Sequence, residues 1–401
     1  MKKYFILLIF FLTVFSSDIY SQWYVQYQSA GVIYDVRFLD QYTGWACGGG
    51  MILKTVNGGN NWTIQNFNAT FNQIHPVNDR IIYACGYYVI YKSTDGGDSW
   101  IVIREGVNQT PILYGLWFID ENTGWFCGDR SVMRTTNGGE TFIDSMFIDS
   151  NLNDIHFKND STGNIAAWGR MYRTTNSGVS WTPIILPVET EVPFMERLTF
   201  VGDTGWTYSN AGRVYRTTNY GLSYDSISLI PLYGLCIEFA DPFVGYAGGW
   251  DGKIYKSTNG GFNWNLSLNI GVGSFVSIFS YSDSIVWATG GSGKIVHTTT
   301  GGLTFINNSV SEIPKSFVLH QNYPNPFNPS TIISYELHNT ENVSLKIFDI
   351  TGSEVSALVN YKQNAGKYNI KFNGENFSSG IYFYKLESKD FSETRKMILT
   401  K

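Results

Sequence analysis

The eight residues Thr55–Trp62 read TVNGGNNW, and this motif decides the fold because six further copies of it follow along the chain. Each copy ends on an aromatic residue, and the intervals between these residues are 38, 42, 39, 43, 40 and 41 positions. The later copies are Ser93–Trp100, Thr135–Phe142, Thr174–Trp181, Thr217–Tyr224, Ser257–Trp264 and Thr298–Phe305. A period of roughly 40 residues is the length of one four-stranded propeller blade.

The composition of the motif indicates a tight hairpin turn. Its third position is an Asx residue in six copies: Asn57, Asp95, Asn137, Asn176, Asn219 and Asn259. An Asx side chain accepts a backbone N–H two residues on and closes a turn, while glycine supplies the positive φ that such a turn needs. The Ser or Thr hydroxyl can satisfy further backbone groups, and the final aromatic ring is expected to pack between adjacent sheets.

Each unit is expected to contain four short strands. In the first unit these are Val32–Asp40, Gly44–Cys47, Met51–Thr55 and Trp62–Asn66. A second signature precedes the second strand, as Thr-Gly followed by Trp45, Trp125, Asn164 or Trp206, and as Val-Gly followed by Tyr246. Seven units fill residues 31–308 and predict seven blades. The segment Trp23–Gln26 resembles an isolated fourth strand and is expected to pair with the last blade and close the ring.

Composition supports an all-β protein. Only 15% of the 401 residues are charged, against a usual figure of about 25%, whereas aromatic residues make up 16% and there are 41 glycines. This balance disfavours coiled coils, helical bundles and disorder. The formal net charge of −5 gives no support to a nucleic-acid or anionic-membrane partner.

The N-terminus is predicted to be a secretory signal peptide, residues 1–21. Lys2 and Lys3 precede an apolar run, Tyr4–Phe15, that is too short for a bilayer-spanning helix. Cleavage is expected between Ser21 and Gln22, which leaves no transmembrane segment in the mature chain. An exported chain normally pairs its cysteines, but Cys47, Cys85 and Cys127 occupy matching positions in successive units, too far apart to bridge. We therefore expect buried free thiols.

The repeat resembles the Asp-box, or bacterial neuraminidase repeat. The unit is similar to those of the photosystem II stability/assembly factor family of seven-bladed propellers, and the resemblance covers about 280 residues of the predicted propeller domain, residues 22–310. Sialidases, xyloglucan-type glycoside hydrolases and sortilin-like receptors share the box, so the resemblance implies a fold and leaves the activity open.

After a linker at residues 311–320, the chain is expected to form a small C-terminal β-sandwich at residues 321–401. Its strands are predicted at Ile332–Leu337, Val343–Asp349, Glu354–Val359, Gly366–Phe372, Gly380–Leu386 and Thr394–Leu399. The run QNYPNPFNPST at Gln321–Thr331, and matching pieces up to the closing KMIL at Lys396–Leu399, resemble the type A C-terminal sorting domain of the type IX (Por) secretion system. This resemblance implies the type IX machinery and a sortase-like protease as partners, and a cell-surface or extracellular address.

The binding site is expected on the face built from the loops between second and third strands and from the links between blades. Aromatic and polar residues occur together in these loops, as suits recognition of an extracellular glycan or a surface protein. The candidates are Tyr87, Tyr88, Asp129, Arg130, Trp168, Arg170, Arg213, Trp250, Asp251, Lys253 and Lys294.

A ring of basic residues stands just before the boxes and provides a second candidate: Lys54, Lys92, Arg134, Arg173, Arg216, Lys256 and His297. Such a ring could bind an anion. The structural interpretation, which we favour, is that each side chain covers a box aromatic ring while its charged head reaches solvent.

A non-catalytic binding protein is the expected function, with a glycoside hydrolase and a structural surface-layer component as alternatives. A sialidase would need three convergent arginines, for which Arg130, Arg170 and Arg213 are available, but its Arg-Ile-Pro opening is absent. A xyloglucanase would need two carboxylates, and Asp129, Asp251, Glu189 and Glu191 are candidates. The five histidines show no metal-ligand spacing, so neither a metal nor a cofactor is expected.

Overall fold

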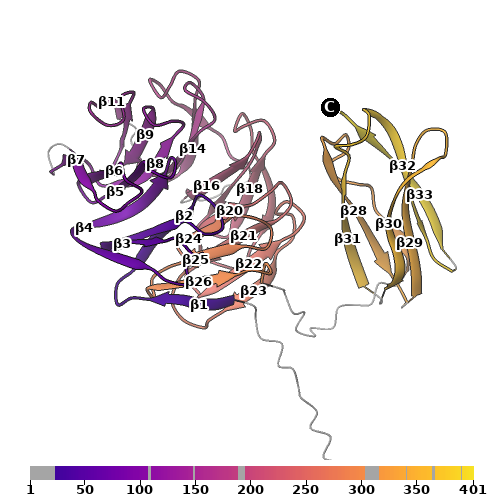
Figure 1. Ribbon diagram of the computed structural model, residues 1–401. Helices are drawn as coiled ribbons and strands as arrows, with labels where there is room; N and C mark the ends of the chain where they lie inside the picture. The colour runs from indigo at the N-terminus through magenta and orange to yellow at the C-terminus, as the bar shows by residue number, and fades with distance from the viewer. Residues whose placement is uncertain are drawn as a thin grey trace, which may run out of the picture. The chain divides into compact units, whose positions relative to one another are not determined.

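The computed structural model describes residues 23–106, 110–147, 150–187, 195–302, 316–339, 341–363, 366–389 and 391–401. The chain divides into two compact units, Met1–Phe305 and Ile306–Lys401, which are considered separately below (Figure 1). The described residues form strands and turns, with no helix among them. The predicted signal peptide and its cleavage site at Ser21 and Gln22 lie outside the described residues.

The first unit is a seven-bladed propeller, as predicted. Blades 1 and 2 share one six-stranded sheet, because β3 and β4 each supply two blade strands. These blades contain β2 (Ile33–Phe38), β3 (Gly44–Thr55), β4 (Thr63–Pro76), β5 (Ile82–Gly86), β6 (Val89–Ser93) and β7 (Ile101–Glu105). Blade 3 contains β8 (Leu113–Phe118), β9 (Gly124–Gly128), β10 (Ser131–Thr135) and β11 (Ile143–Phe147). Blade 4 contains β12 (Leu152–Phe157), β13 (Gly163–Ala167), β14 (Arg170–Thr174) and β15 (Thr182–Ile184).

The remaining blades repeat the same antiparallel order of neighbouring strands. Blade 5 contains β16 (Met195–Val201), β17 (Thr204–Ser209), β18 (Arg213–Thr217) and β19 (Asp225–Leu229). Blade 6 contains β20 (Gly234–Phe239), β21 (Gly245–Gly249), β22 (Lys253–Ser257) and β23 (Asn265–Asn269). Blade 7 contains β24 (Ser277–Ser280), β25 (Val286–Thr289), β26 (Lys294–Thr298) and, as its outer strand, β1 (Trp23–Gln28).

Strand β1 closes the ring, which confirms the prediction for Trp23–Gln26. It pairs antiparallel with β26, from Trp23 opposite Thr298 to Gln28 opposite Lys294. Trp23 is buried, its indole N–H donates to Ser267 Oγ at 3.0 Å, and its ring meets Tyr246 edge-on at 6.2 Å. The first residues of the propeller thus complete the blade built from the last ones, and the outer edge of β26 is covered.

The box turns are closed by side-chain oxygens, over a longer span than expected. Asn57 Oδ1 accepts the N–H of Asn61, four residues on, at 3.0 Å, and Thr55 Oγ1 accepts the N–H of Gly59 at 2.9 Å. The expectation that the Asx side chain accepts an N–H two residues on is therefore wrong. The hydrogen bond that spans two residues is donated by the Asn57 N–H to the Thr55 hydroxyl, at 3.3 Å. The other five Asx residues accept in the same way: Asp95, Asn137, Asn176, Asn219 and Asn259.

Each blade is joined to the next by a side-chain hydrogen bond to the box. The donor is a side chain near the start of the second strand, at the position that follows Thr-Gly in blades 1, 3, 4 and 5. The acceptor is the carbonyl oxygen of the fourth box residue of the following blade, at 2.8–3.3 Å. The seven pairs are Trp45–Gly96, Tyr83–Gly138, Trp125–Ser177, Asn164–Tyr220, Trp206–Gly260, Tyr246–Gly301 and Trp287–Gly58. All seven acceptor residues have a positive φ, between 52° and 77°.

Aromatic stacking accompanies these bonds. Trp125 stacks on Phe157 of the next blade at 3.6 Å, and Trp206 stacks on Phe239 at 3.8 Å. The same arrangement joins blade 7 to blade 1, where Trp287 lies 3.7 Å from Phe38. The box aromatics lie edge-on against these pairs, as Trp181 does against Phe157 and Trp264 against Phe239. Aromatic pairs of this kind add about 0.5–1.5 kcal/mol each beyond the area they bury.

All four cysteines are buried and free, which confirms the prediction from their spacing. Cys47 and Cys127 lie against the first strand of the following blade, where their thiols approach Phe71 O at 3.7 Å and Leu152 O at 3.8 Å. The thiol of Cys236 approaches Phe275 O at 3.4 Å. In all three cases the thiol lies at the seam between one blade and the next.

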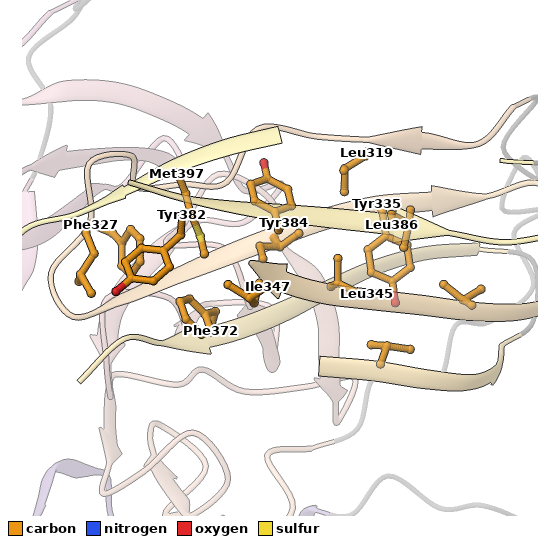
Figure 2. Packing of buried hydrophobic residues seen from close by; sticks show 14 of the residues in the cluster. Leu319, Phe327, Tyr335, Leu345, Ile347, Phe372, Tyr382, Tyr384, Leu386 and Met397 are labelled. Atoms are coloured by element: carbon orange, nitrogen blue, oxygen red, sulfur yellow. The ribbon is translucent and has the colours of Figure 1, made fainter. Parts of the chain in front are cut away.

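The second unit is the predicted β-sandwich. One sheet contains β27 (Val318–Leu319), β28 (Ser330–Leu337) and β31 (Gly366–Asn373); the other contains β30 (Glu354–Gln363), β29 (Glu341–Phe348), β32 (Gly380–Glu387) and β33 (Ser392–Leu399). Alternate side chains meet between the strands in a core that includes Leu345, Ile347, Phe372, Tyr384 and Leu386 (Figure 2). Strand β27 lies inside the stretch expected to be a linker at 311–320, so the sandwich begins earlier than predicted.

The QNYPNPF run has a structural role in this unit. Asn322 is buried, its backbone N–H donates to Tyr384 Oη at 2.7 Å, and its amide donates to Thr331 Oγ1 at 3.0 Å. Phe327 is also buried, and its backbone bonds to Ile398 O, while Asn325 Oδ1 accepts the Ile398 N–H at 2.9 Å. The run thereby covers the outer edge of the last strand, β33, which would otherwise be free to pair with another chain.

Substitution of Trp206 by Phe tests the bond between blades. The change leaves the Gly260 carbonyl without its donor and is expected to lower the free energy of unfolding by about 1–3 kcal/mol. All 12 tryptophans lie in the propeller, so urea unfolding followed by tryptophan fluorescence reports this unit alone. The matched control is Trp168→Phe at a half-exposed position, which should change stability by less than about 0.5 kcal/mol. Equal effects of the two substitutions would contradict the role of the bond.

Candidate functional site

The predicted binding residues lie in the turns between the second and third strands of their blades or, for Arg170, Arg213, Lys253 and Lys294, at the first residue of the third strand. Because every blade is an antiparallel meander beginning at its inner strand, these turns and the links between blades emerge on one face, here called the hairpin face. Backbone bonds hold the turns to the adjoining links: Tyr87 N donates to Thr70 O at 3.0 Å and Trp250 N to Tyr233 O at 3.1 Å. Trp168 N and Asp129 N are held equivalently, by Asn151 O and Ile112 O.

Large aromatic rings are exposed on the hairpin face. The exposed fractions are 44% for Tyr87, 47% for Trp168, 66% for Tyr233 and 63% for Trp250. Tyr233 was not predicted as a site residue. It lies in the link before β20, and only the folded chain brings it next to Trp250. Polar groups accompany the rings; Lys253 Nζ, for example, lies 3.1 Å from Asp251 Oδ2.

The structure brings several predicted residues of blades 2 and 3 together. The pKa of Tyr114 is raised to about 12, first by burial and then by Asp129, to which it is hydrogen-bonded, and by Tyr87 and Tyr88. The turns have the left-handed backbone of tight hairpins, with φ of 61° at Tyr88 and 55° at Arg130. A tyrosine-rich patch beside one carboxylate results on the hairpin face.

The arginines considered for a sialidase lie in different surroundings. Arg130, Arg170 and Arg213 belong to three successive blades. Arg213 Nη1 donates to Ser226 Oγ at 3.1 Å, so this guanidinium is engaged within its own blade. Glu189 and Glu191, considered as hydrolase carboxylates, lie outside the described residues.

The basic residues before the boxes are placed differently from our expectation. Four of them, Lys92, Arg134, Arg216 and Lys256, lie over the aromatic ring on the second strand of their own blade; Lys92 is 5.3 Å from Tyr83, and Arg134 is 5.4 Å from Trp125. The heads do not simply reach solvent. Lys92 Nζ donates to Gly138 O at 2.8 Å, reinforcing the bond that Tyr83 makes to the same carbonyl.

Other members of this basic set follow the same rule. Lys256 Nζ donates to Gly301 O at 2.9 Å, Arg173 Nε donates to Tyr220 O at 3.2 Å, and Lys54 pairs with Asp98 of the next box at 2.6 Å. His297 stacks on Trp287 at 4.5 Å. Lys54, Lys92, Arg173 and Lys256 therefore contribute to the contacts between blades.

The structure contains a second candidate site that sequence reasoning missed. A cavity of about 200 Å³ lies between the first strands of the blades, and all seven blades contribute to its wall. We call it the axial cavity. Its lining consists of Arg37, Phe38, Gln73, His75, Pro76, Leu116, Trp117, Asp154, Ile155, His156, Leu198, Thr199, Phe200, Glu238 and Phe279.

Charged side chains form a network at this cavity. Arg37 Nε lies 3.5 Å from Asp35 Oδ2, and its Nη1 lies 3.7 Å from Glu238 Oε2. Across the cavity wall, Arg197 Nη1 lies 3.8 Å from Asp154 Oδ1. A second, water-sized cavity of about 10 Å³ touches Arg37, Arg197 and Glu238 together.

Burial controls the protonation of these groups. It raises the pKa of Glu238 to about 7, against the lowering effect of Arg37 and with a further rise from Asp154. Burial lowers the pKa of His75 to about 4 and of His156 to about 3, so both imidazoles are neutral at pH 7. The pKa of Glu196, on the neighbouring strand β16, is also raised by burial to about 7.

Among the described residues, no group of histidine, cysteine and carboxylate side chains could hold a metal ion. None of the described segments is a helix long and apolar enough to cross a membrane.

Glu238→Gln tests the cost of this buried charge. The pKa of this carboxyl is higher in the folded protein than its ordinary value of 4.5, so the folded state holds the proton more tightly than the unfolded state. The folded protein therefore loses stability as pH rises from 4.5 to 7. The substitution should raise the free energy of unfolding by about 1–3 kcal/mol at pH 8 and change it little at pH 4. Urea unfolding at both pH values measures this, with the surface change Glu140→Gln as control. An equal gain in the free energy of unfolding at both pH values would contradict the raised pKa of Glu238.

Comparison with known proteins gives a family for the C-terminal unit and a fold for the propeller. Residues 321–400 match the family model of the secretion system C-terminal sorting domain. No curated protein gives a significant sequence match to the chain.

Three solved propellers are similar in structure. YCF48 bound to D1 peptide has a TM-score of 0.59 and 17% identity, over 70% of this chain and 98% of that one. YCF48 from Cyanidioschyzon merolae has a TM-score of 0.57 and 16% identity, over 69% and 98% of the two chains. The WD40 repeats of RRP9 have a TM-score of 0.58 and 11% identity, over 69% and 97%.

These identities establish the propeller fold alone, and the expected resemblance to the photosystem II assembly-factor propellers is confirmed at that level. The chain is thus a β-propeller that ends in a secretion system C-terminal sorting domain, which indicates export by a type IX system to the cell surface or the extracellular space.

Proposed function

We propose that the propeller is a non-catalytic binding module that recognises a glycan or a protein segment outside the cell through its hairpin face. The observation that carries this proposal is the exposure of Tyr87, Trp168, Tyr233 and Trp250 on that one face. Exposed rings lose their contact with water on binding, and their flat faces suit both sugar rings and peptide side chains. Neighbouring polar groups, such as the Asp251–Lys253 pair, would orient the ligand.

The peptide form of this proposal draws support from a similar propeller, YCF48, which has been solved with a peptide bound. The glycan form rests on the two exposed tryptophans, since indole rings bury the apolar faces of sugars well. The hydrolase alternative is less favoured because Asp129 is hydrogen-bonded to Tyr114 and Asp251 is paired with Lys253, on different blades. A structural surface-layer component would bind neither kind of ligand.

Trp168→Ala and Trp250→Ala test the site. The full chain is first applied to a glycan array and to a library of immobilised peptides, and the affinity for any ligand retained is measured by calorimetry. Each substitution is expected to weaken binding about tenfold, because each removes a large contact surface. The control is Tyr42→Ala, which removes a ring of 56% exposure from the turn between the first and second strands.

Two results would contradict the proposal. One is an affinity that falls as much with Tyr42→Ala as with the tryptophan variants. The other is silence on both arrays, which would favour a structural role for the propeller.

Export through the C-terminal unit is tested by deleting residues 321–401. In a bacterium with a type IX system, the full chain is expected at the cell surface or in the medium, and the shortened chain in the periplasm. Immunoblotting of the fractions measures the distribution. Since the sandwich has a core of its own, the propeller should remain folded after deletion, which tryptophan fluorescence checks. Secretion of the shortened chain would show that the C-terminal unit is dispensable for export.

A further inference from the structure

The charges at the axial cavity do not balance. Three carboxylates, on Asp35, Asp154 and Glu238, stand against two guanidinium groups, on Arg37 and Arg197. The two histidines in the wall are neutral and add no positive charge. With all three carboxylates ionised, the network carries one excess negative charge in a partly enclosed space, where such a charge is costly unless it is paired.

The excess charge is located at Glu238. The Asp35 carboxylate accepts hydrogen bonds from Ser277 Oγ at 2.6 Å and from the Ile74 N–H at 3.1 Å. Asp154 is equally well satisfied, by the Leu198 N–H at 3.1 Å and by Gln73 Nε2 at 3.3 Å.

Glu238 lacks such partners. In the described part of the chain its carboxylate meets only Arg37, at 3.7 Å, which is longer than a charge-assisted hydrogen bond of about 2.7–2.9 Å. The Glu238 oxygens therefore remain available to a ligand in the cavity that they line.

Another part of the cavity wall is aromatic. His75 and Trp117 lie edge-on at 5.0 Å, Trp117 and His156 are 4.1 Å apart, and His156 is 4.8 Å from Phe200. Aromatic faces attract cations within about 6 Å of the ring centre.

The volume restricts what can enter. A cavity of about 200 Å³ is slightly larger than the roughly 150 Å³ cavity that holds benzene in an engineered protein. It accepts a short aliphatic chain or one ring, and it excludes an oligosaccharide.

We propose that the axial cavity binds one primary ammonium group on a short aliphatic chain, with Glu238 as its ionic partner and the aromatic wall around its methylene groups. The ammonium group supplies the missing positive charge and three N–H donors. A carboxylate ligand would instead add a second excess negative charge beside Asp154 and Asp35. A small free amine and the lysine side chain of a partner protein share this chemistry.

Calorimetry of the full chain at pH 8 tests the charge of the ligand. The probes are n-butylammonium, n-butanol and butyrate, which have nearly the same length and different charges. Binding of n-butylammonium at least tenfold tighter than of the other two is expected. Equal affinities, preference for butyrate, or no binding of n-butylammonium would overturn the proposal.

Variants test the role of Glu238. Glu238→Gln should weaken n-butylammonium binding at least tenfold, while Glu196→Gln, a change of a carboxyl with a similar pKa that does not line the cavity, should leave it unchanged. Equal losses in both variants would overturn the assignment of Glu238. Comparison with Nα-acetyl-lysine amide then identifies the source: tighter binding of this probe supports a lysine side chain, and weaker binding supports a free amine.

If the Glu238→Gln variant does not fold, the role of Glu238 is tested by the pH dependence of n-butylammonium binding to the unmodified protein. Affinity for n-butylammonium should fall about tenfold per pH unit below pH 7, as Glu238 takes up a proton. The charged groups that face Glu238 are Arg37, Arg197, Asp35 and Asp154, and the two imidazoles in the cavity wall, His75 and His156, are neutral. Affinity that is constant over this range would overturn the proposal.

Discussion

The propeller depends on one repeated hydrogen bond, from a side chain on the second strand of each blade to a backbone carbonyl in the box of the next. The box turn holds that carbonyl in position. The turn is fixed by the positive φ at its fourth residue and by the hydrogen bonds that the Asx side chain and the Ser or Thr hydroxyl accept. The two sequence signatures of the repeat are therefore the two halves of one contact. Seven such contacts run around the ring, and the pair Trp287–Gly58 joins its end to its beginning.

This ring of contacts also determines where chemistry can occur. It uses the second strand, the box and the basic residue before the box, so these positions are nearly alike in every blade. The first strands are left to differ, and they carry Asp35, Gln73, Asp154, Arg197 and Ser277 at equivalent places near the axis. The hairpin turns differ as well. Repeated residues thus hold the ring together, and the residues that vary between blades make its two candidate sites.

Much of the fold could be predicted, because period, turn chemistry and alternation are local properties of the sequence. Seven blades, ring closure by Trp23–Gln26, free thiols and the sandwich strands follow from them. The axial cavity could not be predicted, since Arg37 and Glu238 meet across the ring although they lie 201 positions apart. Sequence order places the basic residues beside the box, and only the pairing of the strands shows that Lys92 and Arg134 lie over rings of the second strand.

Two residues of the conspicuous motif in the sorting domain have a structural role. Asn322 and Phe327, central to its QNYPNPF run, are buried, and both are tied to the last two strands. The motif is conspicuous in the sequence because few residue combinations can turn the chain and cover the edge of β33 at once. A change of Asn322 is therefore expected to disturb the folding of the sandwich. The contacts that the export machinery makes have to be sought among the exposed residues that this folded unit presents.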